Sequence, residues 1–64
     1  MNIVTGEIRE IYDQDGTTTA RVTVKGAIVH VPISFLPHAR VGDTVLIESG
    51  VAISFVQPEP QEEN

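Results

Sequence analysis

The stretch that most constrains the fold runs from Val41 to Phe55 and reads V-G-D-T-V-L-I-E-S-G-V-A-I-S-F. It holds two short apolar segments, 45–47 and 51–55, whose β-branched residues suit a pleated, half-buried strand. Glu48-Ser49-Gly50 separates the segments, and Gly42-Asp43 precedes them at a point where glycine and aspartate favour a sharp turn. This stretch predicts the closing hairpin of a small β-barrel.

Three further strands are expected upstream of this hairpin, over Met1–Tyr12, Thr17–Lys25 and Ala27–Val31. The middle one alternates apolar and polar residues with a period of two, which is typical of a strand with one buried face and one wet face. Turns are predicted at Asp13–Gly16 and at Lys25-Gly26, where aspartate and glycine tolerate turn geometry.

Two irregularities are expected in the first strand. The apolar residues change parity between Ile8 and Ile11, and such a slip predicts a β-bulge or a strong bend. Gly6 marks a second bend or a close approach of another backbone. Small barrels need such bends in order to close.

The link between the third and fourth strands contains two prolines. Pro32 cannot donate to a ladder, so the third strand ends there or lies on an edge. Ile33–Leu36 is too short for a stable helix, and we predict one helical turn that plugs the barrel, with Leu36 facing inward and Phe35 as a second inward candidate. Pro37–Arg40 is expected to form a surface loop.

Five short antiparallel strands with glycine-rich turns predict an all-β domain over residues 1–56, built as an OB-like barrel or a related SH3-like one. The remaining residues, 57–64, read Q-P-E-P-Q-E-E-N and contain no apolar side chain to bury. We therefore expect a disordered acidic tail after the barrel.

Composition narrows the possible partners. The chain has 64 residues and no cysteine, so neither a disulfide nor a thiolate metal site can supplement its single core. Its net charge is −5, and its four cations, Arg9, Arg21, Lys25 and Arg40, are scattered among acids. Nucleic acid is normally held by lysine and arginine contacts to phosphates, so a nucleic-acid partner is disfavoured.

Targeting signals are not evident in the sequence. No run approaches the roughly 18 apolar residues of a membrane span, and the N-terminus lacks a basic region followed by an apolar one. A cytoplasmic location without membrane association is therefore expected.

Catalytic constellations are hard to assemble from these residues. The candidate bases are His30, predicted to face away from the flanking valines, and His38, predicted to lie in a surface loop. Neither has a partner at a spacing typical of a nucleophile–base pair or a metal site. Asp13 and Asp15 resemble the start of a calcium loop, but no glutamate ends the pattern. We expect a protein that is not an enzyme and that holds no metal or cofactor.

A family resemblance becomes visible once these motifs are read together. Val41–Ile47 reads V-G-D-T-V-L-I and Gly50–Ser54 reads G-V-A-I-S, similar to the pattern V-G-D-x-V-L-V-H-x-G-x-A-I-S of the HypC/HupF family of hydrogenase maturation chaperones. The opening Met1–Ile8 follows that family's layout, with Thr5 where proline is usual. The resemblance extends over residues 1–56.

The resemblance implies an OB-like barrel that acts as an assembly chaperone. Such chaperones bind the precursor of the nickel–iron hydrogenase large subunit and an iron-scaffold protein, and help to deliver iron that carries cyanide and carbon monoxide. In the family a cysteine at the second position is central, and a histidine in the closing hairpin assists it. This chain has Asn2 and Glu48 at those positions, and its Pro/Glu tail stands in place of the family's C-terminal helix.

These departures change the expected chemistry. A neutral amide cannot replace a soft thiolate as an iron ligand, so direct iron ligation is not expected. Asn2 is also too bulky to favour removal of Met1. By the resemblance, the partner-binding residues would be Met1, Asn2, Ile3 and Glu48, brought together by barrel closure.

A structural barrel without a maturation role is the alternative hypothesis. Small barrels with more apolar surface than one core can cover often self-associate, and Ile28, Val51 and Phe55 are the candidate interface residues.

Overall fold

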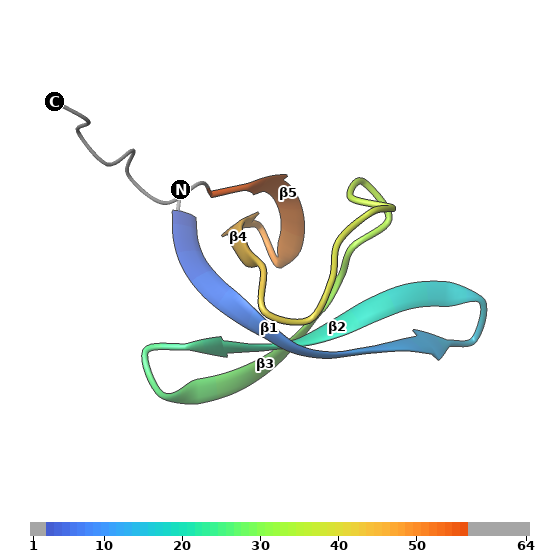
Figure 1. Ribbon diagram of the computed structural model, residues 1–64, viewed down its shortest axis with the longest axis horizontal. Coiled ribbons are helices and arrows are strands. Elements are labelled where there is room, and N and C mark those ends of the chain that lie inside the picture. The colour runs from blue at the N-terminus through green and yellow to red at the C-terminus, as the bar shows by residue number, and fades with distance from the viewer. Residues whose placement is uncertain (1–2, 57–64) are drawn as a thin grey trace, which may run out of the picture.

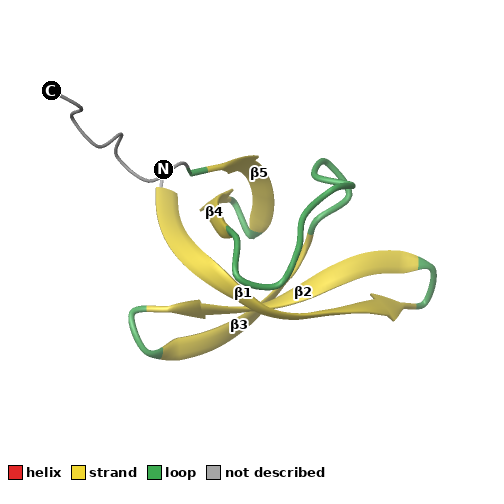
Figure 2. Ribbon diagram, in the orientation of Figure 1, coloured by secondary structure: helices red, strands yellow, loops and turns green. Residues whose placement is uncertain are grey.

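The computed structural model describes residues 3–56, which form five strands joined by turns and loops, with no helix among them (Figures 1 and 2). The strands are β1 (Ile3–Gln14), β2 (Thr17–Val24), β3 (Ala27–Pro32), β4 (Thr44–Glu48) and β5 (Val51–Phe55). These bounds agree with the five predicted strands to within two residues. No helix long and apolar enough to cross a membrane occurs in this described part.

The strands form one antiparallel sheet in the order β3-β2-β1-β4-β5. Strand β1 is the centre of the sheet, because its first half pairs with β4 and its second half pairs with β2. The sheet therefore curls around β1, and Figure 1 shows the β4–β5 hairpin folded to one side of the layer made by β1, β2 and β3. The predicted small five-stranded antiparallel β domain is confirmed.

Closure of this sheet differs from the prediction. Strands β3 and β5 are the two ends of the sheet, and within residues 3–56 no hydrogen-bonded ladder joins them. The architecture is therefore a strongly curled open sheet, which leaves both terminal strands with one free edge. Five short strands carry enough curl to bring β3 towards the β4–β5 hairpin, but not enough to pair the two edges.

The predicted irregularity in β1 is a β-bulge. Ile8 lies opposite Val22 and Glu10 opposite Arg21, so Arg9 is the extra residue. Beside the bulge, the Ile8 N–H donates to the Asp43 carbonyl oxygen at 2.9 Å, and the Gly42 N–H donates to the Ile8 carbonyl oxygen at 2.9 Å. The bulge thus lies close to the point where the pairing of β1 changes from β4 to β2. A bulge bends the strand that carries it, so β1 can pair with both hairpins.

The three hairpin turns share one geometry. In Asp15-Gly16, Lys25-Gly26 and Ser49-Gly50 both central residues have positive φ, between 51° and 88°. Positive φ at both positions defines a type I′ turn, whose twist matches that of the flanking strands. The turns predicted from the sequence are confirmed, and they fix the register of each hairpin.

One side of the curled sheet faces a compact apolar core. The buried apolar side chains come from all five strands and from the loop between β3 and β4: Ile8, Ala20, Val22, Val31, Ile33, Leu36, Val45, Ile47 and Ala52. Most strand contributors alternate with exposed or half-buried residues, as the period-two pattern predicted, although Thr19 is buried directly beside Ala20.

The link between β3 and β4 is a series of tight turns, and the predicted helical turn is wrong. The Leu36 N–H donates to the Ile33 carbonyl oxygen at 2.9 Å, and the Ala39 N–H donates to that of Leu36 at 3.0 Å. Pro37 disfavours helical geometry at the residue before it and supplies no donor, so the first turn cannot propagate. Leu36 is buried as predicted and Ile33 is buried beside it, whereas Phe35 is 69% exposed.

The Val41-Gly42-Asp43 motif forms the last of these turns. Gly42 has a φ of 99°, and the Asp43 N–H donates to the Arg40 carbonyl oxygen at 3.0 Å. The Asp43 carboxylate accepts the Arg40 N–H at 2.9 Å, which locks the turn from its outer side. The motif hydrogen-bonds to Ile8 of β1, and β4 begins at the next residue, Thr44.

Replacement of Gly6 by alanine tests how closely β1 and β2 approach. A Cβ on Gly6 would overlap Val22 Cγ1 and lie 2.8 Å from the Thr23 carbonyl oxygen. We expect Gly6→Ala to lower the free energy of unfolding by about 2 kcal/mol, because the core must shift to accept the methyl group. Urea denaturation measures this loss. Thr5→Val, at the exposed neighbouring position, is the control and should change stability by no more than about 0.5 kcal/mol; equal losses in the two variants would contradict the close approach.

Candidate functional site

Three side chains line up on the outer face of the sheet where β1, β4 and β5 lie side by side. Ile3 in β1 is opposite Glu48 in β4, and Glu48 is opposite Val51 in β5. Cross-strand partners point to the same face, so these residues form one row, which we call the Glu48 row. Leu46 lies on the same face two residues before Glu48 and extends the apolar surface. Neighbouring pairs such as Val4 and Ile47 face the opposite side.

Two of the four residues predicted as a partner-binding site are therefore brought together, namely Ile3 and Glu48. The other two, Met1 and Asn2, lie outside the described residues, as does the predicted disorder of residues 57–64. Sequence reasoning missed Leu46 and Val51 as members of this surface. Hairpin register was the available signal, because a two-residue turn at Ser49-Gly50 places Val51 opposite Glu48.

Glu48 has an uncommon environment for a carboxylate on a strand. Ile3 is 49% exposed, while Glu48, Leu46 and Val51 are half-buried. Two ion pairs occur in residues 3–56, Arg9 with Glu7 at 3.4 Å and Arg21 with Glu10 at 3.0 Å, and Glu48 takes part in neither. The carboxylate thus lies among three apolar side chains, and within residues 3–56 it forms no ion pair.

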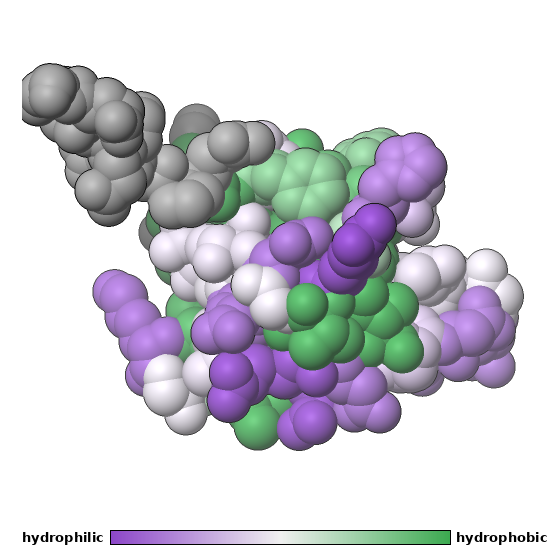
Figure 3. All heavy atoms as spheres, in the orientation of Figure 1, coloured by the Kyte–Doolittle hydropathy of each residue, from purple (hydrophilic) through white to green (hydrophobic). Residues whose placement is uncertain are grey.

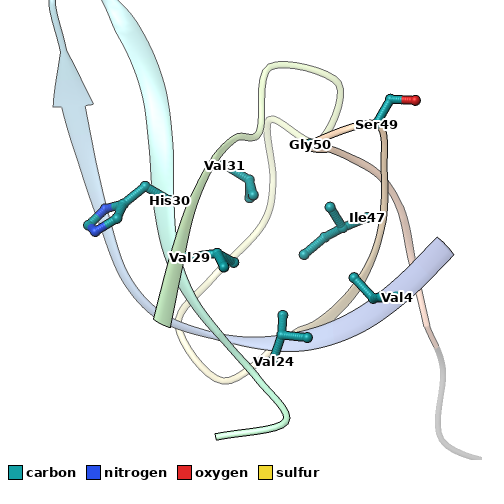
Figure 4. Close-up of a pocket in the computed structure, with 8 residues that line it drawn as sticks. All are labelled: Val4, Val24, Val29, His30, Val31, Ile47, Ser49 and Gly50. Carbon is teal, nitrogen blue, oxygen red and sulfur yellow. The ribbon is translucent and has the colours of Figure 1, made fainter. Parts of the chain in front are cut away.

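A pocket opens on the other side of the same strands, between β3 and the β4–β5 turn. It has a volume of ≈ 380 Å³ and is lined by Val4, Val24, Val29, His30, Val31, Ile47, Ser49 and Gly50. In Figure 4 the valines and Ile47 point into it, whereas the His30 ring points away. The pocket lies where β3 and the β4–β5 hairpin do not pair, and its walls are mostly apolar, so they can hold an apolar group.

The two histidines are on the surface. The Tyr12 hydroxyl lies 2.7 Å from His30 Nδ1, and the two rings meet edge to face, with centroids 6.0 Å apart and planes at 75°. This exposed pair spans β2, since Tyr12 belongs to β1 and His30 to β3. Its formation depends on the register of two ladders, which the sequence pattern did not specify. His38 is exposed in the loop after β3.

Metal-binding side chains are dispersed over residues 3–56. Histidine, aspartate and glutamate do not gather there in any group of three or more. The only charged side chain in the Glu48 row is Glu48 itself. On the face of the molecule seen in Figure 3, hydrophobic areas lie among hydrophilic ones. What the row can do is present mixed apolar and anionic contacts to another molecule.

A small antiparallel β domain with a surface row of this kind has the properties of a protein-binding module. A family model described as the HupF/HypC family matches residues 4–64. The chain therefore belongs to the HupF/HypC family of hydrogenase maturation chaperones, which are not enzymes, and the resemblance seen in the Val41–Ser54 motif is confirmed. No curated protein and no solved structure matches the chain significantly.

A stability measurement can show that the Glu48 carboxylate does not contribute to the free energy of unfolding. Glu48→Val would make the row apolar on all three strands, and favourable cross-strand pairs should raise the free energy of unfolding by about 0.5 kcal/mol. Thermal or urea denaturation gives the value.

Glu10→Val is the matched control for this substitution. Glu10 is also on a strand but pairs with Arg21 at 3.0 Å, so its replacement should bring no gain. If Glu48→Val lost stability, or if both variants gained equally, the apolar setting of Glu48 would not be the cause.

Proposed function

We propose that this protein is an assembly chaperone that docks onto the precursor of the nickel–iron hydrogenase large subunit and onto the iron-scaffold protein that serves it. The match to the HupF/HypC family over nearly the whole chain carries this proposal. In the proposed role the chaperone holds its partners in position during iron delivery and performs no reaction of its own.

The proposed contact surface is the start of β1 together with the end of β4. Ile3 and Glu48 are paired there, and Met1 and Asn2 directly precede Ile3 in the sequence. Apolar area with a charge near its centre is a suitable contact for a protein partner, because the apolar part supplies affinity and the charge supplies selectivity.

Iron is the cargo in this proposal, and the partners ligate it. Asn2 offers a neutral amide where the family has a thiolate, and Glu48 offers a single carboxylate where the family has an imidazole. Low-valent iron with cyanide and carbon monoxide ligands is soft and prefers thiolate. The chain would therefore guide the delivery by docking, without binding the metal.

Self-association is the second candidate function. Ile28 is 53% exposed and Phe55 is 39% exposed, and they lie on β3 and β5, the terminal strands with free edges. The third candidate interface residue, Val51, also lies on β5 and belongs to the Glu48 row, so an assembly through this edge would compete with docking at the row. Light scattering separates the candidates, since a stable closed oligomer that dissociates when Ile28 or Phe55 is replaced by lysine favours the structural role.

The docking proposal predicts measurable binding to both partners. Purified protein should bind the large-subunit precursor and the iron-scaffold protein in calorimetry or co-purification, and Glu48→Lys should weaken at least one of these interactions about tenfold or more, because it replaces attraction by repulsion.

Asp15→Lys is the matched control, with the same change of charge at the far end of β1. Asp15 occupies the first central position of a type I′ turn, with a φ of 51°, and Lys25 occupies the equivalent position of the next turn with the same φ. Lysine is therefore tolerated there, and binding should be unchanged. Failure of folded wild-type protein to bind either partner would overturn the proposed function.

Iron analysis separately tests whether the partners, and not this chain, ligate the iron. After anaerobic co-expression with the scaffold protein and separation from it, this chain should carry only substoichiometric iron, since it supplies no thiolate. Asn2→Cys restores the family's ligand and should raise the iron retained. Stoichiometric iron on the wild-type chain would show that ligation does not need the cysteine.

A further inference from the structure

We infer that Glu48 is the acceptor for an arginine of the partner protein, carried on an apolar segment that covers Ile3, Leu46 and Val51. The inference rests on the proposed docking function and adds the chemistry of the partner. It follows from the position of the carboxylate, which has apolar neighbours on both adjacent strands and along its own strand.

Nothing in the described part of the chain neutralises Glu48. Arg9 and Arg21 are engaged with Glu7 and Glu10, Lys25 lies in the β2–β3 turn, and Arg40 lies in the loop before β4. Glu48 is therefore half-buried and has no ion-pair partner among residues 3–56.

Docking changes the energetics of this group. A partner that covers the apolar side chains must also remove water from the carboxylate, and burial of an unpaired charge is strongly unfavourable. An apolar segment alone would leave Glu48 unpaired, and an acidic one would repel it. The row should therefore bind an apolar segment that carries a cation more tightly than an apolar segment without a charge.

Arginine fits this position better than lysine. Its guanidinium group is planar, donates two parallel hydrogen bonds to one carboxylate and is more weakly hydrated than an ammonium group. Those properties favour arginine where the ion pair forms inside an apolar contact. The partner chemistry is thus an arginine flanked by aliphatic side chains.

A peptide titration followed by ¹H–¹⁵N NMR tests the inference without any hydrogenase component. The probe is acetyl-Val-Leu-Arg-Leu-Val-amide, and the same peptide with glutamate in place of arginine is its counterpart. The arginine peptide should shift the amide signals of Ile3, Leu46, Glu48 and Val51, with binding about tenfold stronger than that of the glutamate peptide.

Variants assign the effect to Glu48. Glu48→Gln should reduce binding of the arginine peptide to the level of the glutamate peptide, and Glu48→Asp should retain part of it. Glu7→Gln is the control, because Glu7 is on the same strand face but paired with Arg9 at 3.4 Å. The dispersion of each spectrum reports whether the variant is folded.

The outcomes separate this inference from the proposed function. Equal shifts with both peptides, or shifts confined to the pocket residues Val29 and Val31, would overturn the arginine site. Undiminished binding of the precursor and the scaffold protein to Glu48→Gln would overturn it as well, while the docking function would stand. Peptide binding at the row with no binding of either protein would sink the docking function and leave the arginine site in place.

Discussion

Strand β1 crosses the whole domain, and its close contact with β2 at Gly6 is the constraint on which the other elements depend. There is no room for a side chain between β1 and β2 beside Val22 and the Thr23 carbonyl. Because Gly6 has none, β1 can lie directly against β2 while it also pairs with β4. The bulge at Arg9 then bends the strand. The glycine and the bulge both lie in the part of β1 where its pairing changes from β4 to β2.

The sequence contains most of this information in local form. Alternation in the second strand, the Asp15-Gly16 and Lys25-Gly26 turns and the parity change after Ile8 each depend on neighbouring residues, and the structure follows them. One helical turn was predicted over Ile33–Leu36, whereas the structure has tight turns between β3 and β4, because Pro37 disfavours helical geometry at Leu36 and donates no hydrogen bond. The failure of the sheet to close into a barrel could not be predicted either, since closure depends on the summed curl of all five strands and not on any one residue.

The residues of the candidate site also differ in whether the sequence alone could predict them. Ile3 and Glu48 were predicted together through a family pattern, and the ladder between β1 and β4 pairs them. Leu46 and Val51 emerge only from register, and the Tyr12–His30 bond requires two ladders at once. An anionic side chain in an otherwise apolar row is a local inconsistency of the kind expected at positions kept for function. The proposed partner-binding role of Glu48 rests on this placement.

The Ile3–Glu48 pairing joins residues that are 45 positions apart in a chain of 64. Each hairpin can form early from its own turn, but the ladder between β1 and β4 must close the longest loop in the domain and gains nothing until it is closed. A nascent or partly unfolded chain therefore lacks the complete Glu48 row. In the proposed docking function, a partner would find its contact surface only on protein that has finished folding.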